Sequence, residues 1–493
     1  MNPFLECLTA LAPEIIVVST ALIVLLADLA MAGGKPVARR AGLAGAITCL
    51  GCALAMAWAG LMPCSAHVAM LAVSPVTQWL KLTLLLLTIF AAALSWGGRF
   101  TRHVGEYFAL LLLAAAGLML LVSSDNLLLI FVALELLSVS LYALAAFDKS
   151  SAASAEAALK YLLFGGMSAA FTLYGISLIY GITGDLQLGY IAARLRGQPA
   201  EPVFYAGLVM TLIGFAFKLA AAPFHLWAPD VYEGAPTPVA SFIASGSKVA
   251  SFFVLARILL TAFPASRGTA GPVDYQPGWV PVLAALAAAS MVAGNVAAIV
   301  QSNVKRLLAY SAIAHAGYAL LALVADARHT LAALLFYTIT YAFTVLGAFA
   351  VVAVMEQSGR RGNLADFEGL GRRAPVLSFC MLVFMLSLAG IPPLAGFFGK
   401  FYLFVAAAAA APPLSLLWLV VLAVAASAVS LYYYLQVLKQ IYAVAPSPTA
   451  AWPRPALSAQ AAIVLLAGIV IVLGCAPDLL LGKITDLLRS HPF

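Results

Sequence analysis

Charged side chains are scarce in this sequence. Asp, Glu, Lys and Arg make up 9% of its 493 residues, whereas hydrophobic residues make up 64%. Soluble globular domains carry about 25% charged residues and about 45–50% apolar ones, so the composition excludes a soluble globular protein. The polar connections between the apolar runs are also too short to fold as a soluble domain. Any redox or nucleotide chemistry is therefore expected on other chains.

The sequence also lacks the clusters that hold metals or nucleic acids. Its six cysteines are scattered, and its CxxC pair, Cys49 and Cys52, lies in an apolar run with no second pair nearby. A structural zinc site takes four ligands, so both cysteines are expected to be small core residues. The net charge of +7 is spread over the loops, which excludes a nucleic-acid-binding patch.

Long apolar runs dominate what is present. A helix needs about 20 apolar residues to cross ~30 Å of hydrocarbon, and runs of this length recur along the whole chain. The sequence predicts an all-α polytopic membrane protein with about fourteen transmembrane helices. The predicted spans are residues 12–31, 41–61, 76–96, 105–122, 126–147, 158–181, 203–227, 237–262, 279–300, 304–325, 329–356, 375–409, 414–442 and 457–475.

Basic residues are unevenly distributed between the two sets of loops, and they favour the cytoplasmic side. If both termini face outward, the inner loops hold fourteen Lys and Arg residues and the outer loops and tail hold six. The inner set is Lys35, Arg39, Arg40, Arg99, Arg102, Lys149, Lys305, Arg306, Arg360, Arg361, Arg372, Arg373, Lys439 and Arg454, and the outer set is Arg194, Arg196, Arg267, Arg328, Lys483 and Arg489. We therefore expect the N-terminus on the outer side.

A few ionisable residues lie deep within the predicted spans. Lys218, Lys248 and Lys400 each sit in an uncharged run, and Glu135 sits in LLIFVALELLSVSL. An ionisable side chain at the bilayer centre costs about 2.5–3.5 kcal/mol or more, so it is retained mainly where it has a function. These four residues are the candidate functional groups.

Other ionisable residues lie nearer the ends of predicted spans. Three of them are expected to snorkel toward the headgroups: Lys81, Lys160 and Arg257. Lys305 either belongs to the excess of basic residues on the inner side or connects the two halves of the protein. Asp230 and Glu233 either admit protons near the inner mouth or lie in a solvated loop.

Two predicted spans contain helix breakers next to a lysine. Pro223 follows Lys218 in the seventh span, and GIPPLAG precedes Lys400 in the twelfth. Proline removes a backbone donor and clashes with the preceding turn, so both helices are predicted to be broken within the membrane. Broken helices in corresponding places indicate transporter repeats. Two unrelated proline kinks are the alternative.

The spacing of the breaks predicts the organisation of the chain. Five spans separate them, which predicts two five-span units, and an odd number of spans inverts the second unit in the membrane. The predicted parts are residues 1–100 with helices 1–3, 101–265 with the first repeat (helices 4–8), 266–445 with the second, inverted repeat (helices 9–13), and 446–493 with helix 14 and a short tail.

The ionisable residues of the first unit suggest a proton-transfer switch. Glu135 and Lys218 are expected to interact in a medium of low dielectric constant. Positive charge arriving at Lys248 would repel the Lys218 ammonium and lower its proton affinity. His225 and His315 can accept and donate protons, so they can bridge lysines through water. The alternatives are a static Glu135–lysine pair that only fixes helix packing, and histidines that are simply hydrogen-bonded in the core.

Three segments resemble one known family: KLAAAPFHLWAPDVYEGAPTPVASFIASGSKVA, NVKRLLAYSAIAHAGY and LSLAGIPPLAGFFGKFYLF. They are similar to the antiporter-like subunits of respiratory complex I, the proton-translocating NADH-quinone oxidoreductase. The resemblance implies fourteen helices with two inverted repeats. It also implies that Glu135, Lys218, Lys248 and Lys400 carry protons. Among the antiporter-like subunits of that family, subunit M has a glutamate in place of Lys400. Subunit L has a long lateral helix, for which residues 476–493 leave little room. The resemblance therefore favours the antiporter-like subunit that is neither L nor M.

The resemblance further implies a function, partners and a location. A chain of this family forms a proton channel in the membrane arm and couples electron transfer from NADH to quinone with proton pumping. NADH, FMN, iron–sulfur clusters and quinone are expected on other subunits, with no cofactor on this chain. Subunit M, small subunits such as K and J, and the lipid bilayer of the bacterial inner membrane are the expected neighbours, with the N-terminus periplasmic. A multisubunit cation/proton antiporter and a channel-free scaffold are the alternatives.

Overall fold

The computed structural model describes residues 8–31, 35–61, 66–68, 70–96, 100–196, 201–271, 275–325, 327–409, 415–445 and 456–490. Predictions on Arg99, Arg454 and the end of the tail lie outside these residues. Three helices come first: α2 (Ala12–Met31), α3 (Val37–Leu61) and α4 (Pro75–Ser95). A short antiparallel hairpin of β1 (Ala66–Val68) and β2 (Leu71–Val73), with Ala66 opposite Val73, connects α3 to α4.

The next group holds five spans, two of them interrupted. Its helices are α5 (Val104–Ser123), α6 (Leu127–Ala145), α7 (Ala152–Thr183), α9 (Pro202–Leu219) continued by α10 (Trp227–Gly234), and α11 (Thr237–Ala244) continued by α12 (Gly246–Thr261). The short helix α8 (Leu188–Leu195) lies in the connection between α7 and α9. A 3-10 turn, η1 (Pro264–Ser266), follows α12.

The last group repeats this order and adds a terminal pair. Its helices are α13 (Trp279–Ile299), α14 (Val304–Val324), α15 (Ala327–Glu356), α17 (Pro375–Ala389) continued by α18 (Ala395–Ala408), and α19 (Leu417–Tyr442). The connection before α17 holds η2 (Leu364–Phe367) and α16 (Leu370–Arg373). The described chain ends with α20 (Leu457–Cys475) and α21 (Asp478–Ser490).

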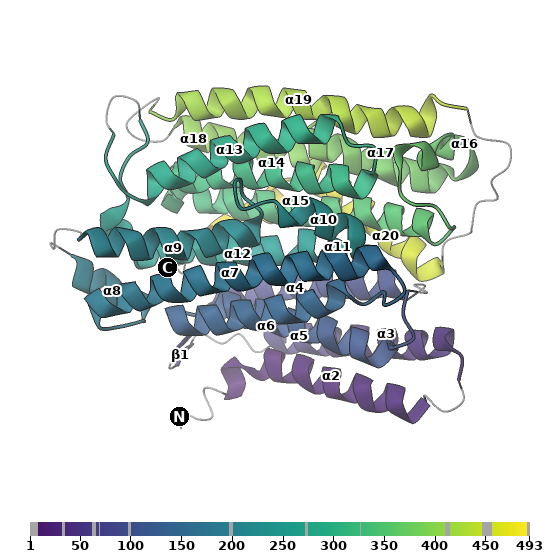
Figure 1. Cartoon of the computed structure of the whole chain (residues 1–493), viewed down its shortest axis with the longest axis horizontal. Coiled ribbons are helices and arrows are strands. Elements are labelled where there is room, and N and C mark those ends of the chain that lie inside the picture. The colour runs from purple at the N-terminus through teal and green to yellow at the C-terminus, as the bar shows by residue number, and fades with distance from the viewer. Residues whose placement is uncertain are drawn as a thin grey trace.

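The prediction of an all-α membrane protein with about fourteen spans is confirmed. Thirteen helices within the described residues are long and apolar enough to cross a membrane, and the shorter apolar helices α17 and α18 together occupy the predicted twelfth span. Figure 1 shows these helices running side by side, with α8 and β1 toward one end of the bundle and α16 at the other. The core lies along α11–α12 and α15, whose apolar windows are completely buried, whereas α2 and α7 bury only 33% of theirs.

The seventh and twelfth spans are broken, as predicted. The first half of each ends in a left-handed residue, Ala220 with φ 56° and Gly390 with φ 88°. Ala220 is unusual because a Cβ disfavours this conformation. Lys218 precedes its break and Lys400 follows its own, so the two lysines do not occupy equivalent positions. The eighth span, predicted to be continuous over residues 237–262, is also interrupted, at Ser245 (φ −108°, ψ −83°).

Corresponding contacts recur within each of the two five-span groups. The side chain of Asn126 caps α6 and that of Asn303 caps α14, each accepting hydrogen bonds from two backbone N–H groups. Each of these asparagines also forms an antiparallel bridge to a later connection, Asn126 to Gln187 and Asn303 to Asn363. Such correspondences support two related units, while the division at 101–265 and 266–445 stays a prediction.

Candidate functional site

Lys218 lies in the last turn of α9, just before the break in the seventh span. Its Nζ donates a hydrogen bond to Ser138 Oγ of α6 at 3.1 Å and lies 5.8 Å from the centre of the Tyr161 ring of α7. The residue is buried, with 6% of its surface exposed. Unpaired carbonyls at a helix C-terminus favour a cation, so the break contributes to holding an ammonium here.

Glu135 and Lys218 line the same small cavity between α6, α7 and α9. Its volume is about 20 Å³, which is room for roughly one water molecule. Both residues belong to the described part of the chain, and no direct ion pair joins them. Ser138, one turn after Glu135, accepts from Lys218 and donates to Leu134 O at 2.6 Å. A hydroxyl group and a cavity large enough for water therefore connect the acid and the lysine.

Lys248 joins the two five-span groups. It is buried on α12, and its Nζ donates to the carbonyl oxygen of Ala312 on α14. The same nitrogen lies 5.7 Å from the centre of the Tyr341 ring on α15. Its polar partner is thus a neutral carbonyl group that belongs to the second group of helices.

His315 lies at the centre of a buried cluster of hydroxyl groups. Its Nδ1 is 2.7 Å from Tyr337 Oη on α15, and its Nε2 is 3.1 Å from Tyr434 Oη on α19. Tyr434 Oη also shares a hydrogen bond with Ser311 Oγ at 2.5 Å. The ring of Tyr341, next to Lys248, has its centre 4.8 Å from that of His315. The histidine is therefore connected to α15 and α19 and lies next to the Lys248 site.

Lys400 lies at the far end of this cluster, on α18 after the break in the twelfth span. Its Nζ donates to Ala389 O at 3.1 Å and to Ser427 Oγ at 2.9 Å. The centre of the Tyr318 ring lies 5.2 Å from this nitrogen and 5.6 Å from the centre of the His315 ring. Tyr318 thus stands between Lys400 and His315.

Sequence reasoning found the lysines and His315 but missed the neutral groups around them. The segment YTITYAF places Tyr337 and Tyr341 four residues apart. This spacing alone predicts that both side chains lie on one face of a helix. The remaining neutral residues come from separate helices, so only the packing of those helices shows that they surround the lysines and His315. The missed contact residues are Ser138, Tyr161, Ser311, Tyr318, Tyr337, Tyr341, Ser427 and Tyr434.

His225 is not brought to this line of residues. It lies in the turn between α9 and α10, where it is half-buried, and its Nδ1 is buried without a hydrogen-bond partner. Across the described residues, no hydrogen bond or ring contact joins its side chain to a buried lysine. The pairing of this histidine with the lysines therefore has no support in the geometry.

Lys81 and Arg257 do not snorkel, contrary to prediction. Lys81 Nζ lies 2.7 Å from Glu14 Oε1 of α2, and the lysine side chain is only 1% exposed. Neither of these charged atoms has an aligned hydrogen-bond partner. Arg257 Nη2 lies 3.5 Å from Asp125 Oδ1, and its side chain is 8% exposed. Both predictions failed because neighbouring helices bury each cation against a carboxylate.

A more exposed ion-pair network surrounds α10. Asp230 accepts hydrogen bonds from Lys160 at 2.6 Å and from Arg306 at 2.7 Å, and Glu233 accepts from Arg306 at 3.0 Å. Asp230 and Glu233 therefore belong to a helix rather than to a solvated loop. Lys160 is 38% exposed and also pairs with Glu156, while its snorkelling toward the headgroups stays a prediction.

The described residues contain no group of three or more His, Cys, Asp or Glu side chains placed to hold a metal ion. Cys49 and Cys52 are unpaired thiols in α3, the first partly buried and the second buried. The candidate site is therefore a set of titratable groups distributed over α6, α9, α12, α14 and α18.

Comparisons with known proteins agree on one family. The profile of the family described as "NADH:quinone oxidoreductase/Mrp antiporter, TM" matches residues 124–430. The chain is 49% identical to NADH-quinone oxidoreductase subunit N 2 of Acidobacterium capsulatum, over 98% of this chain and 99% of that one. It is similar to a chain of respiratory complex I from Thermus thermophilus, at 39% identity and TM-score 0.77, covering 95% and 99% of the two chains. A chain of the Mrp complex from Dietzia shares the fold at TM-score 0.83 and 20% identity, covering 100% and 98%.

Proposed function

Because this chain belongs to the NADH:quinone oxidoreductase/Mrp antiporter family, as a subunit N of NADH-quinone oxidoreductase, we propose that it forms a proton-translocation channel in the membrane arm of complex I. The family expected from the sequence motifs is confirmed. The relative at 49% identity is a complex I subunit, and the Mrp likeness at 20% identity concerns the fold alone. These findings favour complex I over a multisubunit cation/proton antiporter.

One observation carries the proposal: among the residues that the structure describes, the hydrogen-bond partners of Lys218, Lys248 and Lys400 are all neutral groups. Lys218 meets a serine hydroxyl, Lys248 a backbone carbonyl, and Lys400 a carbonyl and a serine hydroxyl. Burying an ammonium is costly unless it is paired, and lysine readily changes its protonation when buried. Within the described residues no carboxylate is hydrogen-bonded to these lysines, so each can gain or lose a proton without breaking a direct ion pair.

The proposed path follows these residues through the bundle. Electron transfer elsewhere in the complex perturbs Glu135 and Lys218, and charge then passes by way of Lys248. His315, bonded to Tyr337 and Tyr434, relays the proton toward Lys400, from which it leaves on the outer side. Imidazole suits this relay because each of its nitrogens can accept or donate a proton.

The surroundings of the chain are part of the proposal. We expect it in the bacterial inner membrane with its N-terminus periplasmic, beside subunit M and small subunits such as K and J. NADH, FMN, iron–sulfur clusters and quinone would be bound by other subunits. The half-exposed apolar faces of α2 and α7 would meet lipid or these neighbours.

Proton pumping by the assembled complex with Lys218→Ala or Glu135→Gln tests the proposal. Removing a group that transfers protons typically costs 10²- to 10⁴-fold, so pumping should fall at least about tenfold. Lys439→Ala is the matched control, because this lysine is also in a long apolar helix but is exposed. Full pumping in assembled Lys218→Ala and Glu135→Gln complexes would instead indicate a scaffold. Sodium-dependent transport without NADH oxidation would indicate a cation/proton antiporter.

A further inference from the structure

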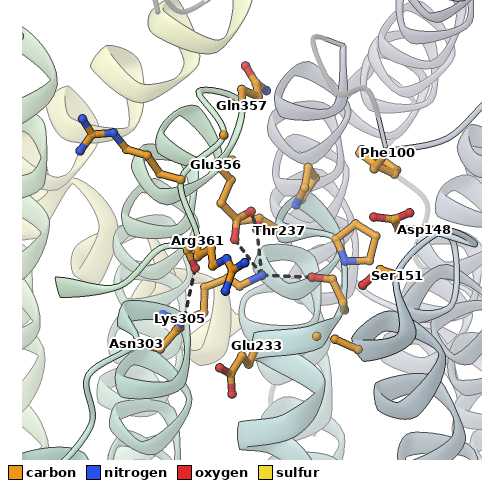
Figure 2. Close-up of a pocket in the computed structure, with 18 of the residues that line it drawn as sticks. Phe100, Asp148, Ser151, Glu233, Thr237, Asn303, Lys305, Glu356, Gln357 and Arg361 are labelled. Atoms are coloured by element: carbon orange, nitrogen blue, oxygen red, sulfur yellow. Dashed lines mark hydrogen bonds and ion pairs between the residues drawn. The ribbon is translucent and has the colours of Figure 1, made fainter. Parts of the chain in front are cut away.

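A large cavity opens at one face of the bundle, and no residue of the proposed path lines it. Its volume is about 1210 Å³, and its lining includes Phe100, Asp148, Glu233, Asn303 and Glu356. These residues lie at connections 3–4, 5–6, 7–8, 9–10 and 11–12, all of which belong to the side predicted to be inner. Figure 2 shows Asp148 and Phe100 across the cavity from Glu356. We refer to this cavity as the vestibule.

Three helices bring one buried cation and one acid together at the vestibule. Lys305 of α14 lies 3.0 Å from Glu356 Oε1 at the end of α15, and its Nζ donates to Thr237 Oγ1 of α11 at 3.3 Å. The Thr237 hydroxyl donates in turn to Glu356 Oε2. Figure 2 shows the three side chains converging. The Glu356 side chain is 26% exposed and that of Lys305 only 7%, so the carboxylate reaches the solvent and the ammonium lies beneath it.

Hydroxyl side chains recur along the eighth span between this triad and Lys248, and we call them the hydroxyl row. Thr237, Ser241 and Ser245 recur every four residues along the eighth span, and Lys248 follows three residues later. Thr237 and Lys248 are eleven residues apart, which is about 16 Å along a helix. Ser241 and Ser245 are completely buried and donate to Pro238 O and Ser241 O, both at 2.7 Å. A hydroxyl that donates to a carbonyl keeps lone pairs that can accept a proton or a water.

The vestibule is separate from the cavity beside Lys218. The two cavities have no lining residue in common. By contrast, Lys305 reaches the first residue of α11, and Lys248 on α12 reaches Ala312 of α14. The eighth and tenth spans are therefore bridged by a lysine at both ends of the hydroxyl row. Within the described residues, the side chains that bridge the vestibule and the eighth span therefore lead toward Lys248.

Building on the proposed function, we propose that the Thr237–Lys305–Glu356 triad takes up protons from the vestibule and delivers them to Lys248. Vestibule water protonates the Glu356 carboxylate. Lys305, which then faces a neutral acid, releases a proton along the hydroxyl row to the neutral amine of Lys248. Lys305 then takes the proton from Glu356. One proton has moved inward, and both members of the pair have regained their original charge.

Other charged groups face the vestibule and set its local potential. Asp148, Glu233, Arg360 and Arg361 line it. Glu233 is paired with Arg306 at 3.0 Å. Glu356 differs from these acids because it touches both a buried lysine and the start of the hydroxyl row. It is therefore the acid that connects the vestibule water to the interior.

Lys305→Arg is the decisive variant, measured as protons taken up per NADH oxidised in inverted membrane vesicles, whose buffer bathes the inner face. Arginine keeps the ion pair with Glu356 but does not release a proton. A transfer role predicts that Lys305→Arg and Glu356→Gln lower the rate of NADH-driven proton uptake through this chain at least about tenfold, with a lower ratio of protons to NADH, and that Thr237→Val lowers the uptake while Thr237→Ser preserves it. Gln357→Ala, an exposed position at the same cavity, should have no effect.

The outcomes separate this inference from the proposed function. Normal proton uptake in an assembled Lys305→Arg complex would overturn the triad as the uptake site. If Lys218→Ala still abolished pumping in that case, the channel assignment would stand and only the uptake site would be wrong. If Lys218→Ala also pumped normally, the channel assignment itself would fail. If the Glu356→Gln complex does not assemble, the comparison of proton uptake between Thr237→Val and Thr237→Ser decides the same question.

Discussion

The N-terminal helices and the centre of the bundle both bury lysines, but they surround them differently. Lys81 of α4 has a carboxylate at 2.7 Å, from Glu14 of α2. Lys218, Lys248 and Lys400 instead bond to hydroxyl or carbonyl oxygens and lie beside tyrosine rings. Burial is similar in all four cases. The counter-ion, rather than the depth of burial, therefore distinguishes a structural lysine from a candidate proton carrier.

The two environments have different consequences for a change in charge. Neutralising one member of a buried ion pair leaves the other charge desolvated and unpaired, which opposes any change in protonation. A lysine that bonds to hydroxyls and carbonyls leaves only neutral dipoles behind when it loses its proton. Lys305, which has a buried ammonium and a partly exposed carboxylate partner, lies between these two cases.

The largest effect is expected at Lys248, because on the proposed path its ammonium connects the first group of spans to the second. Lys248→Met removes the titratable group but keeps an unbranched side chain of similar length. Proton pumping should fall by at least about 10²-fold while the complex still assembles. Pumping in vesicles, normalised to the assembled complex, measures this. Pumping near the level of the unmodified complex would show that charge bypasses Lys248.

The second effect should appear in stability rather than in pumping. Glu14→Gln or Lys81→Met leaves a buried charge unpaired, which typically costs about 3–5 kcal/mol. The double variant removes both charges and should recover most of that loss. Thermal unfolding and yield of the assembled complex measure this, and protons pumped per NADH should stay unchanged in every variant that assembles. A lowered pumping ratio in the double variant would place this pair among the proton carriers.

The two kinds of lysine also differ in how well the sequence predicts them. The apolar runs, the broken seventh and twelfth spans and the depth of Lys218, Lys248 and Lys400 could be read from the chain, because they depend on local pattern. The Glu14–Lys81 pair could not, because its members are 67 positions apart and meet only in the folded helix bundle, where α2 packs against α3 and α5. For the same reason Lys81 was mistaken for a snorkelling residue, and the tyrosines around His315 were missed.

A smaller effect is expected from the phenol groups that surround His315. Tyr337→Phe and Tyr434→Phe each remove one hydroxyl group that bonds to the imidazole and keep the ring. In each single variant the remaining phenol still orients the imidazole, so the pumping rate should fall only several-fold. This loss is smaller than the 10²-fold loss typical of a removed acid or base. The double variant should lose more than the two singles combined, because it leaves the imidazole without either partner. Additive losses would place the phenols outside the relay.

The smallest effect is expected at His225, and it separates the two histidines. His315→Asn removes a ring held between Tyr337 and Tyr434 and should lower pumping, whereas His225→Asn, in the turn between α9 and α10, should leave it nearly unchanged. Asparagine preserves a polar side chain in the turn but cannot carry a proton at neutral pH. Equal losses in the two variants, compared at matched amounts of assembled complex, would mean that water links His225 to Lys218. The break in the seventh span would then be a part of the path itself rather than only the support of its lysine.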